Sequence, residues 1–208
     1  LLDKLRSLKS RHTVNYLGSN IGLAIEEPIA WIKIFNFDIQ RFYSDPEFYF
    51  EQVLRQKIWL CENFPEYSEY VPFEMPASLG YYPEYTFIGL KVAYNTDGVP
   101  VIENNHPLKS CADIALLKPV DFKTSGWMPR ILKWYDAILK ISAGRIKVTY
   151  NMEWWRGCLD QAIELRGFEN FINDTIERPG FVKDLLGWLT ENRCNWHRQY
   201  TEYFGTKI

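Results

Sequence analysis

The residue types best suited to chemistry gather in one short segment, which reads Glu153, Trp154, Trp155 and Arg156. Asn151 precedes them and directly follows residues 146–150, whose alternating pattern predicts a strand. A carboxylate at a strand end, shielded from water by two indoles, could act as a general base or anchor a ligand. We therefore predict Glu153 as a catalytic residue and the rest of the segment as substrate-binding residues, namely Asn151, Trp154, Trp155 and Arg156. The alternative is a surface loop in which Glu153 pairs with Arg156 above packed Trp side chains.

Histidine and cysteine give weaker signals. His106 could be a ligand or an acid–base group, and we include it among the substrate-binding candidates, although its stretch also fits a loop leaving a hairpin. Cys194 and His197 lie three residues apart in a predicted helix, but two ligands do not make a zinc site, which needs three or four. The four cysteines show no CxxC spacing. We predict no metal site in this chain, and thiols that are reduced and mostly buried.

The elements that must position these residues alternate between strand and helix patterns. Apolar or alternating stretches predict strands at 29–37, 70–74 and 146–150. Helical spacing predicts helices at 46–64, 111–117, 127–141, 157–176 and 179–204. Asp97–Gly98 between 91–94 and 99–102 predicts an inserted β-hairpin. This order predicts an α/β fold with parallel strands. Three strands are too few for a parallel sheet, which must be covered on both faces, so we expect part of a larger barrel or sheet.

Composition and charge exclude several classes of protein. The 24 Lys and Arg residues nearly balance the 26 Asp and Glu residues, so the basic excess of a nucleic-acid binder or a polybasic membrane-surface protein is missing. No apolar run approaches the roughly 18 residues that a membrane helix needs. Reduced thiols favour the cytoplasm as the location. The 16% of aromatic residues predicts a core of large rings, a pocket or a partner surface.

Several short stretches share the order and spacing of motifs in a known family. They are Asp45–Glu47 with the helix after it, then 89–92, 106–110, 162–169 and 178–186. From about residue 80 onward the sequence resembles the uroporphyrinogen decarboxylase superfamily, which includes cobalamin- and coenzyme-M-linked methyltransferases. The best stretch is Arg178–Pro179–Gly180, followed by Phe181–Leu186, which is similar to a helix motif of that family.

The resemblance implies a TIM-type (β/α)₈ barrel, which needs about 250 residues, and this chain covers only its first half. We accordingly expect an N-terminal helical arm at 1–28 and, at 29–208, the first half of a uroporphyrinogen-decarboxylase-like barrel with an inserted hairpin. An unclosed half-barrel exposes strand edges and apolar surface. We therefore expect either a second polypeptide that supplies the rest of the barrel or self-association.

The resemblance also adds two candidate site residues. Glu74 ends the second predicted strand, roughly where the family places an acidic pocket residue, and is predicted to be catalytic; the alternative is a solvated strand-end acid. Arg41 follows the first predicted strand, where the family's decarboxylases carry paired arginines that meet substrate carboxylates. Arg41 could hold one anion through a bidentate contact, or it could pair structurally with Asp45.

Methyl transfer involving a corrinoid or thiol acceptor is the function that the resemblance favours. The paired arginines of the decarboxylases are not evident, and Ile163 stands where those enzymes carry a helix Tyr. The alternatives are decarboxylation of a tetrapyrrole-like polycarboxylate and a non-catalytic scaffold or binding subunit. The substrate would be a small molecule, and any zinc or corrinoid would come through a partner chain, because the family segments that hold the zinc ligands are absent.

Overall fold

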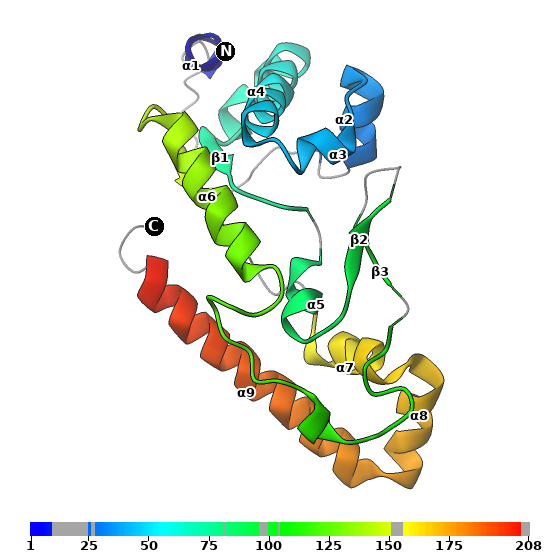
Figure 1. Cartoon of the computed structure of the whole chain (residues 1–208). Helices are drawn as coiled ribbons and strands as arrows, with labels where there is room; N and C mark the ends of the chain where they lie inside the picture. The colour runs from blue at the N-terminus through cyan, green and yellow to red at the C-terminus, as the bar shows by residue number, and fades with distance from the viewer. Residues whose placement is uncertain are drawn as a thin grey trace. The chain divides into compact units, whose positions relative to one another are not determined.

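The computed structural model describes residues 1–9, 25, 28–80, 82–95, 100–103, 105–150 and 156–204. Helices make up most of this part, and its strands are short (Figure 1). None of the described helices has the length and apolar character that a membrane crossing requires. The chain groups into two compact units: unit 1 is Leu1–Ser78, Thr96–Val99 and Lys133–Asn151, and unit 2 is Leu79–Asn95, Pro100–Leu132 and Met152–Ile208.

Unit 1 combines helices with one pair of parallel strands. Its elements are α1 (Leu2–Lys9), α2 (Pro28–Phe35), α3 (Ile39–Phe42), α4 (Pro46–Asn63), the 3-10 helix η1 (Pro65–Tyr70), β1 (Glu74–Pro76), the part of α6 (Met128–Ser142) from Lys133 on, and β4 (Lys147–Thr149). Strands β1 and β4 pair in parallel, with Met75 opposite Val148. Both side chains are buried, so the strand pair lies in the core of unit 1.

Helix α4 follows directly from its sequence. The Asp45 side chain caps it by accepting hydrogen bonds from two backbone N–H groups of the first turn, both at 3.1 Å, and Pro46 occupies the first helical position. Tyr49 then points into the core, where its hydroxyl donates to the carbonyl of Pro76 in β1 at 2.7 Å. Its ring meets that of Trp134 in α6 edge-on, with centroids 5.3 Å apart. Tyr49 therefore ties α4 to both β1 and α6.

The strand predicted at 29–37 is wrong, because this stretch forms helix α2. Trp31 and Phe35 stack on one face of the helix with centroids 5.8 Å apart, and Trp31 also meets Trp59 of α4 at 5.6 Å. Pro28 at the first helical position suits this start. Periodicity alone does not separate a buried strand from a short buried helix, and here contacts between residues four apart favour the helix.

Unit 2 contains the hairpin and the C-terminal helices. Its elements are α5 (Pro83–Phe87), β2 (Val92–Tyr94), β3 (Pro100–Ile102), η2 (Ile114–Leu116), α6 up to Leu132, α7 (Cys158–Arg166), α8 (Phe168–Glu177) and α9 (Pro179–Phe204). Strands β2 and β3 pair antiparallel, as the hairpin prediction requires, and the predicted turn at 96–99 lies outside the described residues. The helix predicted at 157–176 is divided at Gly167, whose φ of 83° ends α7. The helix predicted at 111–117 is only the short η2.

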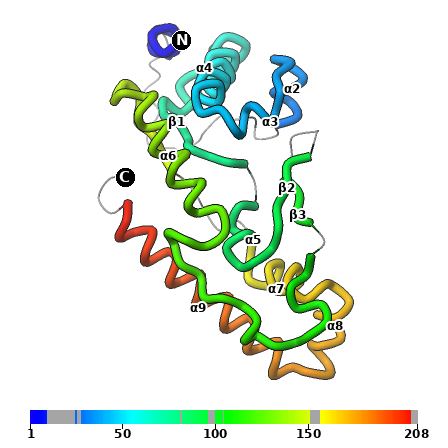
Figure 2. Tube along the Cα trace, viewed as in Figure 1, coloured from blue at the N-terminus to red at the C-terminus, as the bar shows by residue number. Residues whose placement is uncertain are grey.

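Helix α9 organises the core of unit 2. Trp196 is fully buried, stacks on Phe87 with centroids 5.9 Å apart and meets Phe122 edge-on at 5.3 Å. The chain between η2 and α6 runs along α9 (Figure 2) and is held there by a hydrogen bond from the Phe122 N–H to the Gln199 side chain at 2.8 Å. Trp196 is therefore one of the large rings that build the core of unit 2.

The fold class is α/β and mostly helical. The described strands form two separate two-stranded sheets, β1–β4 and β2–β3, so the described part of the chain shows no barrel and the half-barrel stays a prediction. In the predicted arm at 1–28, α1 buries Leu2 and Leu5.

The expectation of mostly buried thiols is wrong. Cys61 is buried, whereas Cys111 and Cys194 are exposed and Cys158 is partly exposed. Cys194 lies two residues before the buried Trp196, and two residues along a helix turn the side chain to nearly the opposite face. The helix period therefore places the Cys194 thiol toward solvent.

Two lysines hold the backbone carbonyls that lead into β1. Lys57 of α4 is only 9% exposed and donates to the carbonyl of Pro72 at 2.9 Å. Lys9 of α1 donates to the carbonyl of Ser68 at 3.0 Å. Burial lowers the pKa of Lys57 to about 8, and the Glu74 carboxylate raises it only in part. An ammonium group removed from water holds its proton less tightly, so Lys57 should link the stability of unit 1 to pH.

Replacing Lys57 should change how stability depends on pH. The folded chain releases the Lys57 proton near pH 8, whereas the unfolded chain keeps it up to about pH 10.4. Between these values the unfolded state binds more protons, so the free energy of unfolding should rise with pH. Urea unfolding at about pH 7.5 and about pH 9.5 should show this rise reduced by about 1–2 kcal/mol in Lys57→Met. Lys140→Met, at an exposed position of α6, is the control and should keep the wild-type rise. Equal rises in Lys57→Met and wild type would contradict the burial of this charge.

Candidate functional site

A buried carboxyl group in unit 2 has the properties of an acid–base residue. Glu84, the second residue of α5, is fully buried. Its Oε1 accepts a hydrogen bond from the backbone N–H of Arg156 at 3.4 Å. Its Oε2 is buried and has no hydrogen-bond partner among the described residues. Most buried polar atoms in folded proteins are hydrogen-bonded, so this oxygen requires an explanation.

The pKa of the Glu84 carboxyl is raised because burial disfavours the charged form. Its hydrogen bonds to backbone N–H groups and the charges of Arg156 and Arg193 act in the opposite direction without cancelling the effect of burial. A carboxyl group with a raised pKa gives up or takes a proton closer to neutral pH than an ordinary glutamate. Glu84 is therefore suited to act as a general acid or a general base.

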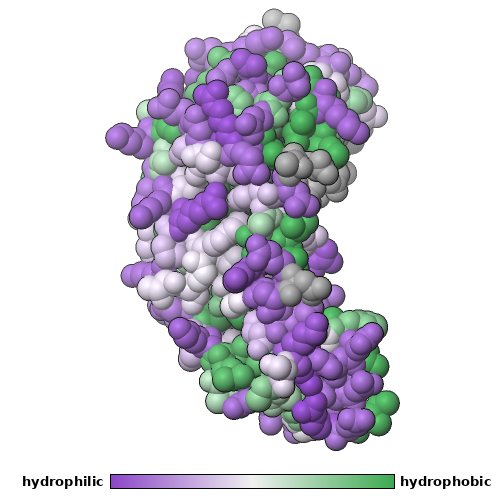
Figure 3. Space-filling model, turned by 45° about the vertical axis from the view of Figure 1, so that its right-hand side comes forward, coloured by the Kyte–Doolittle hydropathy of each residue, from purple (hydrophilic) through white to green (hydrophobic). Residues whose placement is uncertain are grey.

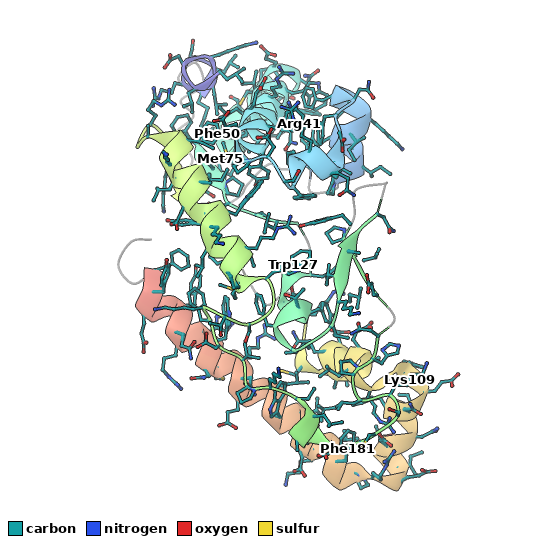
Figure 4. The ribbon with its side chains drawn as sticks, in the orientation of Figure 1. Arg41, Phe50, Met75, Lys109, Trp127 and Phe181 are labelled. Carbon is teal, nitrogen blue, oxygen red and sulfur yellow. The ribbon has the colours of Figure 1, made fainter. Side chains whose placement is uncertain are left out.

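The residues two positions before and after Glu84 are both closely constrained. Tyr82, at the N-cap of α5, has a φ of 67°, in the left-handed region that a non-glycine residue rarely adopts. Gly126 has a φ of 50° and approaches Thr86 so closely that a Cβ at this position would collide with it. The Thr86 hydroxyl accepts a hydrogen bond from the N–H of Trp127 at 2.9 Å (Figure 4 labels Trp127). These contacts fix α5, and with it the position of Glu84.

Arg156 is the member of the predicted cluster that the structure describes. Its side chain is exposed, its Nη2 donates to the hydroxyl of Tyr82 at 2.9 Å, and its guanidinium lies over the Tyr82 ring at 5.2 Å. Its carbonyl accepts a hydrogen bond from Arg193 at 3.2 Å. The structure thus brings Arg156 to Glu84. The remaining members of the cluster lie outside the described residues and stay predictions: Asn151, Glu153, Trp154 and Trp155.

His106 lies beside α7 in a fixed orientation. Its Nδ1 is 2.6 Å from the carbonyl oxygen of Glu164. Because a carbonyl oxygen only accepts, we assign the ring proton to Nδ1, which leaves Nε2 of the neutral ring with a lone pair. Gly167 packs near the ring, where a Cβ would lie 3.6 Å from it. The role of His106 in substrate binding remains a prediction.

A buried ion network holds the loop that carries His106. Asp174 is buried and accepts from Arg166 at 2.7 Å and from Arg178 at 2.5 Å. Burial raises the pKa of Asp174, but the hydrogen bonds and charges of the two arginines outweigh it, so the pKa is lowered. Arg166 also donates to the carbonyl of Lys109 at 2.6 Å (Lys109 is labelled in Figure 4). The network therefore fastens the His106 loop to α7 and α8.

Arg41 pairs with Asp45, which is the structural alternative to anion binding. Its Nε lies 3.2 Å from Asp45 Oδ2, and its guanidinium lies 4.2 Å from the centre of the Phe48 ring (Figure 4). The Arg41–Asp45 pair is largely exposed, and such pairs add little to stability. Arg41 belongs to unit 1, whereas Arg156 and His106 belong to unit 2.

Glu74 begins its strand, whereas the sequence predicted that it ends one. It is the first residue of β1, opposite Lys147 of β4. Pro72 explains the shift, because its missing N–H keeps it out of the ladder and pairing begins two residues later. Glu74 is partly buried and belongs to unit 1, and its catalytic role stays a prediction.

Sequence reasoning missed Glu84, although its position carried a signal. Pro83 followed by an acid is a typical helix start, so an acid here is normally assigned to the exposed first turn, where it stabilises the helix dipole. The apolar character of Tyr85 and Phe87 was the clue that α5 is buried, and both side chains are almost fully covered. The burial of α5, however, depends on residues far along the chain: Arg156 contacts Glu84, and Gly126 contacts Thr86.

The described residues do not form a metal site. Across the described ranges, no three His, Cys, Asp or Glu side chains lie close enough together to hold a metal ion. Zinc therefore does not fit the described part of the chain. No described contact identifies a corrinoid site either.

Comparison with known proteins assigns no family to the chain. No family model and no curated protein matches it. Among solved structures, a methyltransferase from Methanosarcina mazei matches 91% of this chain and 52% of its own chain, at 14% identity and a TM-score of 0.48. The chain thus spans about half the length of that methyltransferase.

Replacing Glu84 by its neutral isostere should not destabilise unit 2. Because the folded pKa is raised, the folded state keeps the proton longer than the unfolded state, and stability falls as pH rises through this window. Glu84→Gln removes that fall, so near neutral pH it should unfold at the same or a higher urea concentration than the wild type. Glu103→Gln, at an exposed position, serves as the matched control. A loss above about 1 kcal/mol in Glu84→Gln would mean that the carboxylate is needed for packing.

Asp174 should behave in the opposite way. Asp174→Asn keeps the shape but leaves Arg166 buried without its countercharge, so it should lower the free energy of unfolding by about 3–5 kcal/mol. Urea unfolding measures this loss, and Asp184→Asn at an exposed position of α9 should be nearly neutral. A loss below about 1 kcal/mol in Asp174→Asn would show that the network does not hold the loop.

Proposed function

We propose that unit 2 carries an acid–base site in which Glu84 accepts or donates a proton during methyl transfer. The observation that supports this proposal is the full burial of the Glu84 carboxyl together with an Oε2 that has no hydrogen-bond partner among the described residues. A purely structural buried acid satisfies both of its oxygens, as Asp174 does with Arg166 and Arg178. Oε2 of Glu84 has no such partner among the described residues, which suits this oxygen to a proton that is exchanged with a substrate.

The motif resemblance favours a thiol as the methyl acceptor. In this reaction the acceptor sulfur forms a bond to the methyl carbon, the bond from that carbon to the donor breaks, and its electron pair stays with the donor. The S–H proton must leave, and Glu84 Oε2 takes it. Its raised pKa makes the Glu84 carboxylate a better base than an ordinary glutamate, and general-base catalysis of this kind contributes about 10²–10⁴-fold in rate.

Arg156 would bind an anionic part of the substrate next to this base. Its guanidinium is exposed, charged at all relevant pH values and oriented by the hydroxyl and ring of Tyr82. The segment that precedes Arg156 contains Glu153, the base that the sequence predicts. Glu84 and Glu153 are therefore both candidates for the proton acceptor, and the experiment below distinguishes them.

The methyl donor would be a methyl-corrinoid, held with zinc by a partner chain. The described residues fit neither group, so the part of this chain is restricted to proton transfer and substrate contact. A partner that completes the barrel agrees with the size of the β1–β4 sheet, since parallel sheets usually contain more strands and no third described strand pairs with these two.

Methyl transfer should depend on Glu84. The assay combines the full chain with the partner chain proposed to hold zinc and the corrinoid, adds methylcobalamin and the thiol coenzyme M, and follows the loss of methylcobalamin by absorbance. Glu84→Gln should reduce the rate by about 10²–10⁴ without lowering the melting temperature, because it removes the base and keeps the shape. The control Glu103→Gln should retain the wild-type rate.

Three other outcomes would contradict the proposal. A normal rate in Glu84→Gln with a loss in Glu153→Gln would make Glu153 the base. Release of CO₂ from a tetrapyrrole polycarboxylate in place of methyl transfer would favour the decarboxylase alternative. No methyl transfer by the wild-type chain assembled with its partner would favour the scaffold alternative.

A further inference from the structure

Helix α8 carries a row of large apolar side chains that the described residues leave exposed. Phe168 is 65% exposed, Ile172 43% and Ile176 81%. They lie four residues apart, so at about 100° per residue they share an arc of about 80° on one helix face. We call this row the α8 stripe. Figure 3 shows apolar side chains at the surface in the lower right of the molecule.

The α8 stripe is more than the usual scatter of exposed apolar residues. The buried face of α8 holds Asp174 and Phe171, and Phe171 lies about 60° around the helix from Phe168 of the stripe. The apolar sector is thus wider than the part that packs within unit 2. A soluble helix normally presents polar residues outside its buried face, and a continuous exposed apolar row is typical of an interaction site.

The helix that bears the stripe is firmly held. Arg166 and Arg178 both bind the buried Asp174, one from α7 and one from the residue before α9. The guanidinium of Arg178 also lies over the Phe181 ring at 5.9 Å (Figure 4 labels Phe181). The stripe is therefore presented in a fixed arrangement, which lowers the entropy that a partner's binding must overcome.

The charges beside the stripe indicate what kind of partner fits it. The residue after each member of the stripe is exposed and polar, namely Glu169, Asn173 and Glu177. The stripe thus has an acidic border at both ends of the helix. In a symmetric antiparallel pair of two copies, Ile172 would face its own counterpart, and Glu169 would lie near Glu177 of the second copy. Like charges would then face each other, which disfavours a second copy as the occupant.

We propose that the α8 stripe docks an amphipathic helix of a different protein chain. The apolar residues of this helix, spaced four apart, would cover Phe168, Ile172 and Ile176. Its Lys or Arg residues would meet Glu169 and Glu177 at the border. This is the helix-against-apolar-face mode of recognition, with the charges selecting the partner. The proposal is independent of the role of Glu84.

Two helical peptides test the proposal with the full chain. Both carry Leu residues four apart; one has Lys and the other Glu at the flanking positions. Fluorescence anisotropy should show the Lys peptide binding about tenfold or more tightly than the Glu peptide. Ile176→Asp should weaken binding of the Lys peptide by about tenfold or more, and the melting temperature should not fall, because Ile176 is 81% exposed. Leu159→Asp, at a 56% exposed position of α7, is the control and should bind normally.

Charge reversal and competing occupants complete the test. Glu169→Lys with Glu177→Lys should make the chain prefer the Glu peptide. Equal binding of both peptides, or binding of neither, would overturn the proposal. Sedimentation that shows a dimer abolished by Ile176→Asp would mean that a second copy covers the stripe. Binding to phosphatidylcholine vesicles that Ile176→Asp abolishes would mean that the stripe meets a lipid surface.

Discussion

A charge removed from water must be compensated, and this constraint explains the most informative contacts of the molecule. Asp174 meets it fully, because each of its oxygens accepts from an arginine and its pKa falls in spite of burial. Lys57 meets it in part, through one carbonyl and the charge of Glu74, and its pKa is lowered. Glu84 meets it least: one oxygen accepts a long hydrogen bond and the other has no partner among the described residues. The compensated Asp174 therefore has a structural role, whereas the poorly compensated Glu84 is the candidate for chemistry.

The compensated charges hold the loops on which the candidate site depends. Arg166 reaches from Asp174 to the carbonyl of Lys109, and so fixes the loop on which His106 meets Glu164. The contact of Thr86 with Trp127 fixes α5 in the same way. Among the described residues, a buried acid without full compensation in such a rigid setting fits a functional residue, since strain and unpaired groups tend to be retained where chemistry requires them.

Local signals in the sequence predicted those parts of the fold in which neighbouring residues decide the structure. Asp45 with Pro46 marked the start of α4, and the strands of the β2–β3 hairpin were found from alternation around Asp97–Gly98. The apolar run at 29–37 failed, because contacts of Trp31 with α4 favour a helix and no local rule contains them. Glu84 could not be found for the same reason. Its burial comes from residues far along the chain, so its sequence reads as an ordinary helix start.

Glu84 should hold a proton at a higher pH than an ordinary glutamate, because its carboxyl is buried. The most direct measurement is a carboxyl ¹³C NMR titration of the full chain, with the Glu84 resonance assigned from its loss in Glu84→Gln. Glu84 should titrate above the ordinary glutamate value of about 4.3, while Asp174 should titrate below the ordinary aspartate value of about 3.9. A Glu84 resonance that titrates at or below the ordinary glutamate value would contradict a role for Glu84 in proton exchange, because the carboxyl would then be a stable anion.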